Sequence, residues 1–90
     1  MKWIIDVVIS MQKQLPQIVR KEFSNYNFLP YKGLEIEDGA WENPKKIKSV
    51  SFNPSKECVY LILANDIIPN KLKFSEQIEL YKTHSWKVLG

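Results

Sequence analysis

The clearest pattern in the chain is an uninterrupted apolar run, Cys58–Ala64, which carries no charged side chain. A strand with one exposed face alternates apolar and polar residues, whereas an unbroken run of β-branched and aromatic residues is typical of a strand covered on both faces. Pro54–Ser55 precedes the run and Asn65–Asp66 follows it, so its length fits a strand better than a helix. We therefore expect a central strand here, with the other elements packed around it.

The N-terminal segment, residues 3–23, spaces apolar residues three and four apart, as one face of a helix requires. These positions are Ile4, Val8, Met11, Leu15, Ile18, Val19 and Phe23. Pro16 interrupts the pattern, because a proline inside a helix removes a hydrogen bond and clashes with the preceding turn, at a cost of about 3 kcal/mol or more. The periodicity therefore predicts a kinked helix. The alternative is a strand over Lys2–Ile9, which is rich in β-branched residues, followed by a helix that begins at Pro16.

Residues 24–42 combine a loop with a predicted hairpin. Ser24–Gly33 mixes turn formers with large apolar side chains, which indicates a loop that folds back against the core. Leu34–Glu37 then alternates and ends at Asp38–Gly39, a strong turn dipeptide. Ala40–Glu42 follows as the expected returning strand, so the acidic residues of this segment should lie on a hairpin.

The next predicted strand, Ile47–Phe52, has one buried face. Strict alternation places Val50 and Phe52 on one face of this strand and Ile47 on the other. The turn formers of Asn53–Lys56 lead directly into the apolar run, so an antiparallel hairpin is the simplest connection between the two strands.

The C-terminal segment alternates after a turn at Pro69–Asn70. Most even positions from residue 72 to residue 88 are apolar, which predicts two strands, Leu72–Tyr81 and Ser85–Leu89. Together the elements predict an α+β fold, in which an N-terminal kinked helix packs on a mainly antiparallel sheet of about four to five strands. A chain of 90 residues sustains one core, so residues 1–90 should form a single α+β domain.

Composition and charge exclude several classes of protein. Hydrophobic residues make up 44% and charged residues 26%, as in ordinary globular domains, and the net charge of +3 favours no partner strongly. The single cysteine excludes an internal disulfide, and the single histidine excludes a metal site built on a histidine pair. We therefore expect no cofactor and no bound metal.

No segment is expected to enter a membrane. The apolar stretch Met1–Ile9 loosely resembles a signal peptide, but Asp6 interrupts it and no small-residue cleavage site follows. No run approaches the roughly 20 apolar residues that a membrane span needs. A cytoplasmic protein is therefore the expectation.

Residues that could carry catalysis are sparse. With three glycines the chain has no phosphate-cradling loop, and its serines lack the glycine pattern of a nucleophile elbow. His84 could act as a general acid or base beside Tyr81, Lys82 and Lys87, as in a small ribonuclease. Catalysis also needs a cleft and partner groups that the sequence does not show, so we expect a solvated histidine and no enzyme activity.

Charge is segregated in the middle of the chain, where four acidic residues and a tryptophan share the segment Leu34–Glu42, which has no lysine or arginine. An aromatic ring among carboxylates resembles a protein-binding hot spot, in which the ring supplies buried area and the charges steer a basic partner. The alternative is that Trp41 packs into the core and the acids are solvated turn residues. The candidate partner-binding residues are Glu35, Glu37, Asp38, Trp41 and Glu42.

A second candidate surface is basic. Lysines cluster directly after the acidic segment and recur near residue 72, so together with the histidine they could follow a phosphate backbone. Lysines at strand edges also prevent edge-to-edge aggregation, which explains them without a ligand. The candidate nucleic-acid-binding residues are Lys45, Lys46, Lys48, Lys71, Lys73 and His84.

The sequence most favours a non-enzymatic protein-binding module. We expect a small inhibitor, immunity protein or antitoxin that occludes the functional surface of a basic partner protein, such as a nuclease or another toxin. The alternative is a small nucleic-acid-binding module or ribonuclease that acts through the lysine-rich strands and His84. A third alternative is a homodimer formed through an uncovered edge strand, and the oligomeric state stays open.

Overall fold

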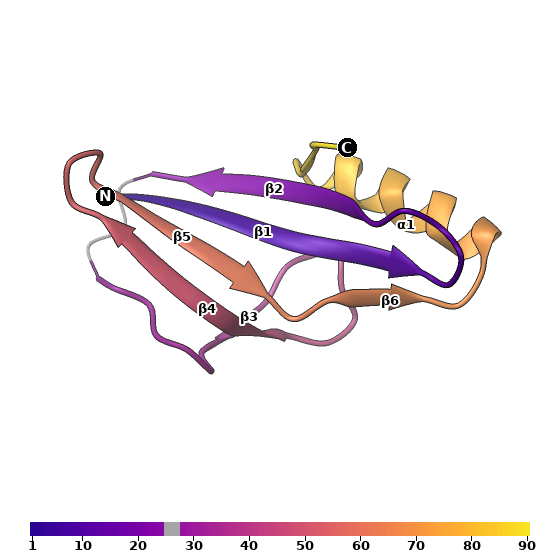
Figure 1. Ribbon diagram of the computed structural model, residues 1–90, viewed down its shortest axis with the longest axis horizontal. Coiled ribbons are helices and arrows are strands. Elements are labelled where there is room, and N and C mark those ends of the chain that lie inside the picture. The colour runs from indigo at the N-terminus through magenta and orange to yellow at the C-terminus, as the bar shows by residue number, and fades with distance from the viewer. Residues whose placement is uncertain (25–27) are drawn as a thin grey trace.

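A long N-terminal hairpin lies at the centre of the computed structural model, which describes residues 1–24 and 28–90 (Figure 1). β1 (Lys2–Met11) pairs antiparallel with β2 (Gln17–Phe23). The predicted N-terminal kinked helix is therefore wrong. The strand of the alternative interpretation is present, because Lys2–Ile9 falls within β1, but a second strand follows Pro16 where a helix was expected.

Side-chain chemistry explains why this segment is extended. Five β-branched residues between positions 4 and 9 favour a pleated strand, and Pro16 cannot continue a helix. The chain turns at Lys13, whose φ of 66° lies in the left-handed region. Every second side chain of β1 belongs to the core cluster, as a strand predicts, although Ile4 on the opposite face is buried as well. The β1 residues of this cluster are Trp3, Ile5, Val7 and Ile9.

Seven strands of the described residues form one sheet. Beside the hairpin these are β3 (Glu35–Ile36), β4 (Lys45–Asn53), β5 (Cys58–Leu63), β6 (Asp66–Ile68) and β7 (Lys87–Val88). The strand order is β3-β4-β5-β1-β2-β7, and β6 pairs with β1 beyond the end of β5. β5 and β6 run parallel to β1, and the other pairings are antiparallel. The antiparallel-rich sheet and the β4–β5 hairpin agree with the sequence prediction.

β5 is the predicted central strand, because it lies between β4 and β1 in the sheet. Its two faces are not equally covered. Val59, Leu61 and Leu63 are fully buried, whereas Ile62 on the opposite face is 43% exposed. The expectation that this strand is covered on both faces is therefore met only in part, because Cys58 on the outer face is buried and Tyr60 is half-buried, while Ile62 is exposed.

A β-bulge in β4 changes the predicted faces of that strand. Ile47 pairs with Leu63 and Ser49 pairs with Ile62, so the register shifts between Ile47 and Ser49. The extra residue turns Ile47 to the same face as Val50, although strict alternation places them on opposite faces. Ile47 is consequently buried in the core.

The predicted C-terminal strand Leu72–Tyr81 is wrong, because Lys71–Thr83 forms the helix α1. Asn70 caps this helix, since its side-chain oxygen accepts a hydrogen bond from the Lys73 N–H at 2.9 Å. Most residues of α1 have straight-chain side chains, which lose little rotamer freedom in a helix. Of the second predicted strand, Ser85–Leu89, only the short β7 forms.

Part of the predicted loop Ser24–Gly33, residues 25–27, lies outside the described residues. Phe28 packs edge-on against Trp3 with their ring centroids 5.1 Å apart, and Pro30 is buried. Phe28 and Pro30 therefore fold back against the core, as the sequence predicts, whereas Leu29 and Tyr31 are exposed.

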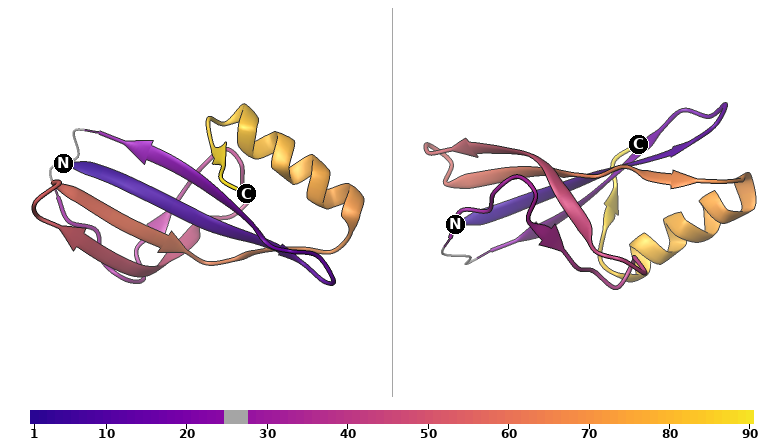
Figure 2. Two further views of the ribbon diagram at one scale, coloured as in Figure 1. Left: turned by 45° about the horizontal axis from the view of Figure 1, so that its top comes forward. Right: turned by 90° about the horizontal axis from the view of Figure 1, so that it is seen from below.

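The sheet curls into a half-barrel, and α1 lies over one end of its concave face (Figure 2). The concave face carries the core, to which the C-terminal segment contributes Tyr81 and Trp86. The predicted arrangement, an N-terminal helix on a sheet, is thus replaced by a curled sheet with one C-terminal helix. The radius of gyration of 13.4 Å is that of a compact domain of this length. Within the described ranges, no helix is both long enough and apolar enough to cross a bilayer.

We expect Asn70→Ala to lower the free energy of unfolding by about 1 kcal/mol, because the first turn of α1 loses its cap. Ser75→Ala, at an exposed position inside the same helix, is the matched control and should leave stability within about 0.5 kcal/mol. Chemical denaturation followed by circular dichroism measures both variants. Equal stability of Asn70→Ala and the native chain would contradict a helix that begins at Lys71.

Candidate functional site

The acidic loop, residues 37–44, connects β3 to β4 and carries most of the candidate partner-binding residues. The turn predicted at Asp38–Gly39 is present, and the Trp41 N–H donates to the Asp38 carbonyl at 3.1 Å. The predicted returning strand Ala40–Glu42 is wrong, because β3 pairs with β4 and not with these residues. Side-chain contacts therefore hold the acidic loop in place.

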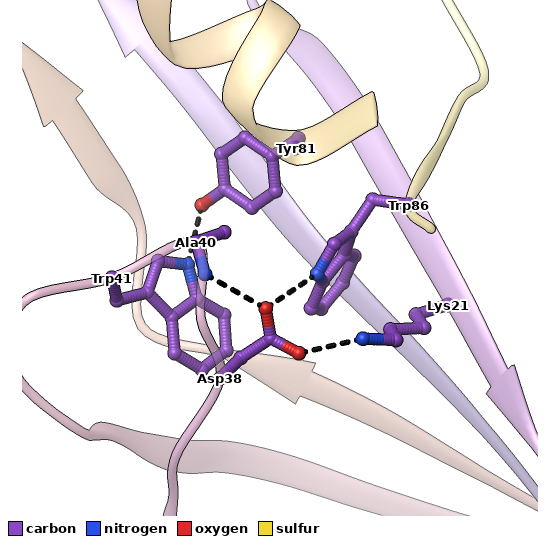
Figure 3. A network of polar contacts seen from close by, with 6 residues as sticks. All are labelled: Lys21, Asp38, Ala40, Trp41, Tyr81 and Trp86. Atoms are coloured by element: carbon purple, nitrogen blue, oxygen red, sulfur yellow. Dashed lines mark hydrogen bonds and ion pairs between the residues drawn. The ribbon is translucent and has the colours of Figure 1, made fainter. Parts of the chain in front are cut away.

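The carboxylate of Asp38 is the main attachment point of the acidic loop (Figure 3). Its Oδ1 accepts a hydrogen bond from Lys21 Nζ at 2.8 Å, and its Oδ2 accepts from the Ala40 N–H and from Trp86 Nε1, each at 3.0 Å. The Asp38 side chain is only 8% exposed. Asp38 thus joins the acidic loop to β2 and to the segment that follows α1.

These contacts stabilise the charged form of Asp38. Burial acts to raise the pKa of this carboxyl, but the hydrogen bonds from Lys21, Trp86 and the Ala40 N–H outweigh it, so the pKa of Asp38 lies below its ordinary value. Both oxygens of this carboxylate thus accept hydrogen bonds from the protein itself. Among the candidate partner-binding residues, Asp38 therefore has a structural role, because its buried contacts hold the acidic loop in place.

Trp41 is half-buried and forms a second attachment point. Its Nε1 donates to the Tyr81 hydroxyl at 2.7 Å, and that hydroxyl donates to Asp66 Oδ2 at 2.8 Å. Burial raises the pKa of Tyr81, so its hydroxyl stays protonated and can donate to Asp66. The Trp41 ring also lies 5.6 Å from the Trp86 ring, centroid to centroid. Trp41 is thus attached to the core along one edge, while part of its surface remains accessible.

The C-terminal end of α1 packs against the acidic loop. A Cβ atom at Gly39 would lie 2.5 Å from His84 Cε1, so a larger residue here would have to displace the His84 side chain. The His84 N–H donates to the Tyr81 carbonyl at 3.1 Å and so satisfies the last turn of the helix. The Gln77 side-chain amide donates to the Ala40 carbonyl at 2.9 Å. Both side chains hold the loop backbone against the helix.

Most of the predicted partner-binding residues line one surface hollow of about 430 Å³, here called the loop hollow. Its lining residues are Glu37, Asp38, Gly39, Trp41, Glu42, Asn43 and Pro44. Glu35 does not line the hollow and lies on β3, opposite Lys46 of β4. Glu35, Glu37 and Glu42 are exposed, and none of them makes an ion pair with another described residue. The loop hollow is therefore acidic.

The candidate nucleic-acid-binding residues come from different elements. β4 carries Lys45, Lys46 and Lys48, the start of α1 carries Lys71 and Lys73, and its end carries His84. The Lys45 ammonium lies 3.8 Å from Asp66 and 5.7 Å from the centroid of the Trp41 ring. Lys73 pairs with Glu76 at 3.5 Å. Lys45 is engaged within the chain, whereas Lys46, Lys48, Lys71 and Lys73 are exposed, and the Lys73–Glu76 pair itself lies in solvent.

Neither a metal centre nor a known relative defines this site. In the ranges that the structure describes, no group of three or more His, Cys, Asp and Glu side chains is arranged to hold a metal ion. Comparisons of the chain with protein-family models, with curated proteins and with solved structures found no match. Inference about function therefore rests on the geometry of the site.

Sequence reasoning missed the residues that hold the acidic loop from behind. Lys21, Tyr81 and Trp86 come from segments far from Asp38 in the chain, and no local pattern connects them. One general signal was present, because a buried tryptophan needs an acceptor for its N–H and a carboxylate can supply it. That signal does not say which carboxylate is used.

We expect Asp38→Asn to lower the free energy of unfolding at neutral pH by about 1–3 kcal/mol, because Lys21 loses its counter-ion. The pKa of Asp38 is lower in the folded than in the unfolded chain, where it is near 3.8. Its contribution to stability is therefore present above that value and is lost as the pH falls through the folded-state pKa. Part of the acid destabilisation of the native chain should be absent in Asp38→Asn.

Glu57→Gln is the matched control, because Glu57 is exposed and makes no ion pair with another described residue. This variant should keep the acid dependence of the native chain. Denaturant titrations at several pH values between about 2 and 7 measure all three proteins, a range that brackets the ordinary pKa of aspartate. If Asp38→Asn lost stability on acidification as steeply as the native chain, the linkage assigned to Asp38 would be wrong.

Proposed function

We propose that this chain is a non-enzymatic protein-binding module whose acidic loop occupies the functional surface of a basic partner protein, in the manner of an inhibitor, immunity protein or antitoxin. The proposal rests on the two different roles of the side chains in the acidic loop. Asp38 and Trp41 attach the loop to the core, while Glu37 and Glu42 stay exposed and unpaired within the described residues. A cytoplasmic location is part of the same proposal.

Preorganisation of the acidic loop supports this function. A loop that is already held in one conformation has less freedom to lose on association, which lowers the cost of binding. Its attachments come from β2, from α1 and from the segment after α1, through Lys21, Gln77 and Trp86. The exposed carboxylates are therefore presented from a fixed backbone.

The composition of the loop hollow also supports a protein partner. Trp41 lines the hollow together with Glu37 and Glu42. An aromatic ring next to charges matches the anchors that dominate protein interfaces, and carboxylates select a partner with lysine or arginine at the contact. The same carboxylates would repel a phosphate backbone.

The nucleic-acid alternative has less support. Lys45 is paired with Asp66 and His84 packs on the acidic loop, so these two candidate groups are less free to meet phosphates. If this alternative holds, RNA or single-stranded DNA will bind with an affinity that falls about 10-fold or more between 50 and 200 mM salt. A flat salt response or absence of binding would eliminate it.

The test of the proposal starts from a protein partner that co-purifies with the chain from the cells that produce it. We expect Glu37→Lys combined with Glu42→Lys to weaken that complex by about 10- to 100-fold in titration calorimetry, because two attractive charges become repulsive. The folded state should be retained, since both side chains are exposed.

The matched control is Glu57→Lys combined with Glu79→Lys, which changes the net charge equally at exposed positions outside the loop hollow. This pair should leave the affinity within about 3-fold of the native value, because charges outside a contact are screened by salt. Equal weakening by both pairs, or no weakening by the first pair, would contradict the acidic loop as the contact surface.

A further inference from the structure

Of the two ends of the concave face of the half-barrel, α1 covers one. α1 contacts β6 and β7 and lies over the end of β1 that pairs with β6. The N-terminus of the chain lies at the opposite end of β1, away from α1 (Figure 1). At that end the concave face opens into a groove of about 540 Å³, here called the apolar groove, and no residue of α1 lines it. Its volume falls within the roughly 300–1,000 Å³ typical of ligand sites.

Hydrophobic side chains from three segments line the apolar groove. They are Trp3 and Ile5 of β1, Phe23 of β2, and Phe28, Leu34 and Ile36 of the segment that crosses the open end. Trp3 and Ile5 are almost fully buried, whereas Phe28 is 56% exposed and packs edge-on against Trp3. The buried side chains of Trp3 and Ile5 thus lie beneath Phe28, which solvent still reaches.

Carboxylates belong to the lining of the apolar groove. Glu35 and Glu37 are part of it, and both side chains are exposed. Lys21 lies near Phe23, with its ammonium 5.4 Å from the ring centroid, but Asp38 neutralises this charge at 2.8 Å. The charged residues that line the groove itself are therefore negative, although Lys46 of β4 lies opposite Glu35, so Glu37 is the lining carboxylate without a lysine directly across from it.

The apolar groove and the loop hollow adjoin each other. Glu37 and Pro44 line both of them. One extended segment that crossed this boundary could place an apolar side chain in the groove and a cationic side chain beside Glu37. Such a segment would also continue toward Glu42 in the loop hollow.

We propose that the apolar groove receives an anchor from the partner protein, namely a large apolar side chain that is flanked in sequence by lysine or arginine. This inference rests on the proposed function, because it assigns the partner's contact chemistry at the same surface. Burial of an apolar side chain supplies the affinity, and the pairing of Glu35 and Glu37 with the flanking cations supplies the selection. The anchor matches the hot spots of protein interfaces, where a buried aromatic or aliphatic group fills a pocket.

Short peptides test the chemistry of the groove directly. The probe is acetyl-Lys-Lys-Phe-Leu-Lys-Lys-amide, and two matched peptides replace either all lysines by glutamate or Phe-Leu by Ala-Ala. We expect the probe to shift the NMR signals of Trp3, Leu34 and Ile36, and to bind at least 10-fold more tightly than either matched peptide. Equal binding of the three peptides, or shifts confined to residues outside the groove, would overturn the inference.

Variants separate the hydrophobic from the charged contribution. Phe28→Ala, which removes part of the exposed wall, should weaken the probe about 3- to 10-fold, and Glu37→Lys should abolish the preference for lysine over glutamate peptides. Phe52→Ala is the matched control, because Phe52 is a similarly exposed phenylalanine outside the groove, and it should bind the probe as the native chain does. Equal weakening by Phe28→Ala and Phe52→Ala would contradict the groove as the binding site.

The purified partner distinguishes this inference from the proposed function. If Phe28→Ala leaves the partner's affinity unchanged while Glu37→Lys with Glu42→Lys weakens it, the proposed function stands and the anchor in the groove is wrong. If the probe peptide binds in the groove but the partner ignores the charge reversal, the proposed function fails. Weakening by both sets of variants is the result that we expect.

Discussion

The structure depends on the burial of one carboxylate among three donors. Removing a carboxylate from water costs several kcal/mol unless its oxygens are hydrogen-bonded and its charge is paired. Asp38 meets this condition with Lys21, the Ala40 N–H and Trp86, which belong to β2, the acidic loop and the segment after α1. The carboxylate is satisfied only when all three parts are in place, so the loop, the hairpin and the C-terminal segment stabilise one another.

The same constraint divides neighbouring acids of one loop into different roles. Asp38 turns inward and is enclosed, so Glu37 beside it is left on the surface. Trp41 combines both roles in one side chain, because its N–H donates to Tyr81 while part of the residue stays accessible. A loop of irregular backbone thereby presents charge and aromatic surface from a fixed position, without a strand ladder to hold it.

The sequence correctly predicted those features of the fold that depend on residues close to one another in the chain. The β4–β5 hairpin followed from a turn between two apolar strands, and the acidic residues were grouped correctly because they are contiguous in sequence. The N-terminal hairpin was not predicted, because apolar residues of both its strands face the same core. Along the sequence these residues lie three and four positions apart, as they would on one face of a helix. The helix α1 was missed because its alternation was weighted above the cap at Asn70 and the shortage of β-branched residues. The supports Lys21, Tyr81 and Trp86 reach Asp38 and Trp41 only through tertiary structure, which no period along the chain encodes.

The overall charge of the chain limits how the proposed basic partner could be recognised. The net charge is +3, so the chain as a whole repels such a partner weakly at long range. At physiological ionic strength the screening length is about 8 Å. The molecule is larger than this, with a radius of gyration of 13.4 Å, so a partner at the acidic loop would sense the loop carboxylates and the nearby Lys45 more than the lysines far from the loop.

Electrostatic attraction of this short range selects a partner but gives little affinity by itself, because exposed ion pairs contribute only about 0–1 kcal/mol each. Most of the binding free energy must then come from the burial of hydrophobic surface next to the charges. The end of the half-barrel that α1 leaves open offers that surface beside Glu37. In the proposed complex, the hydrophobic surface of the groove would supply affinity and the exposed acids of the loop would supply selection.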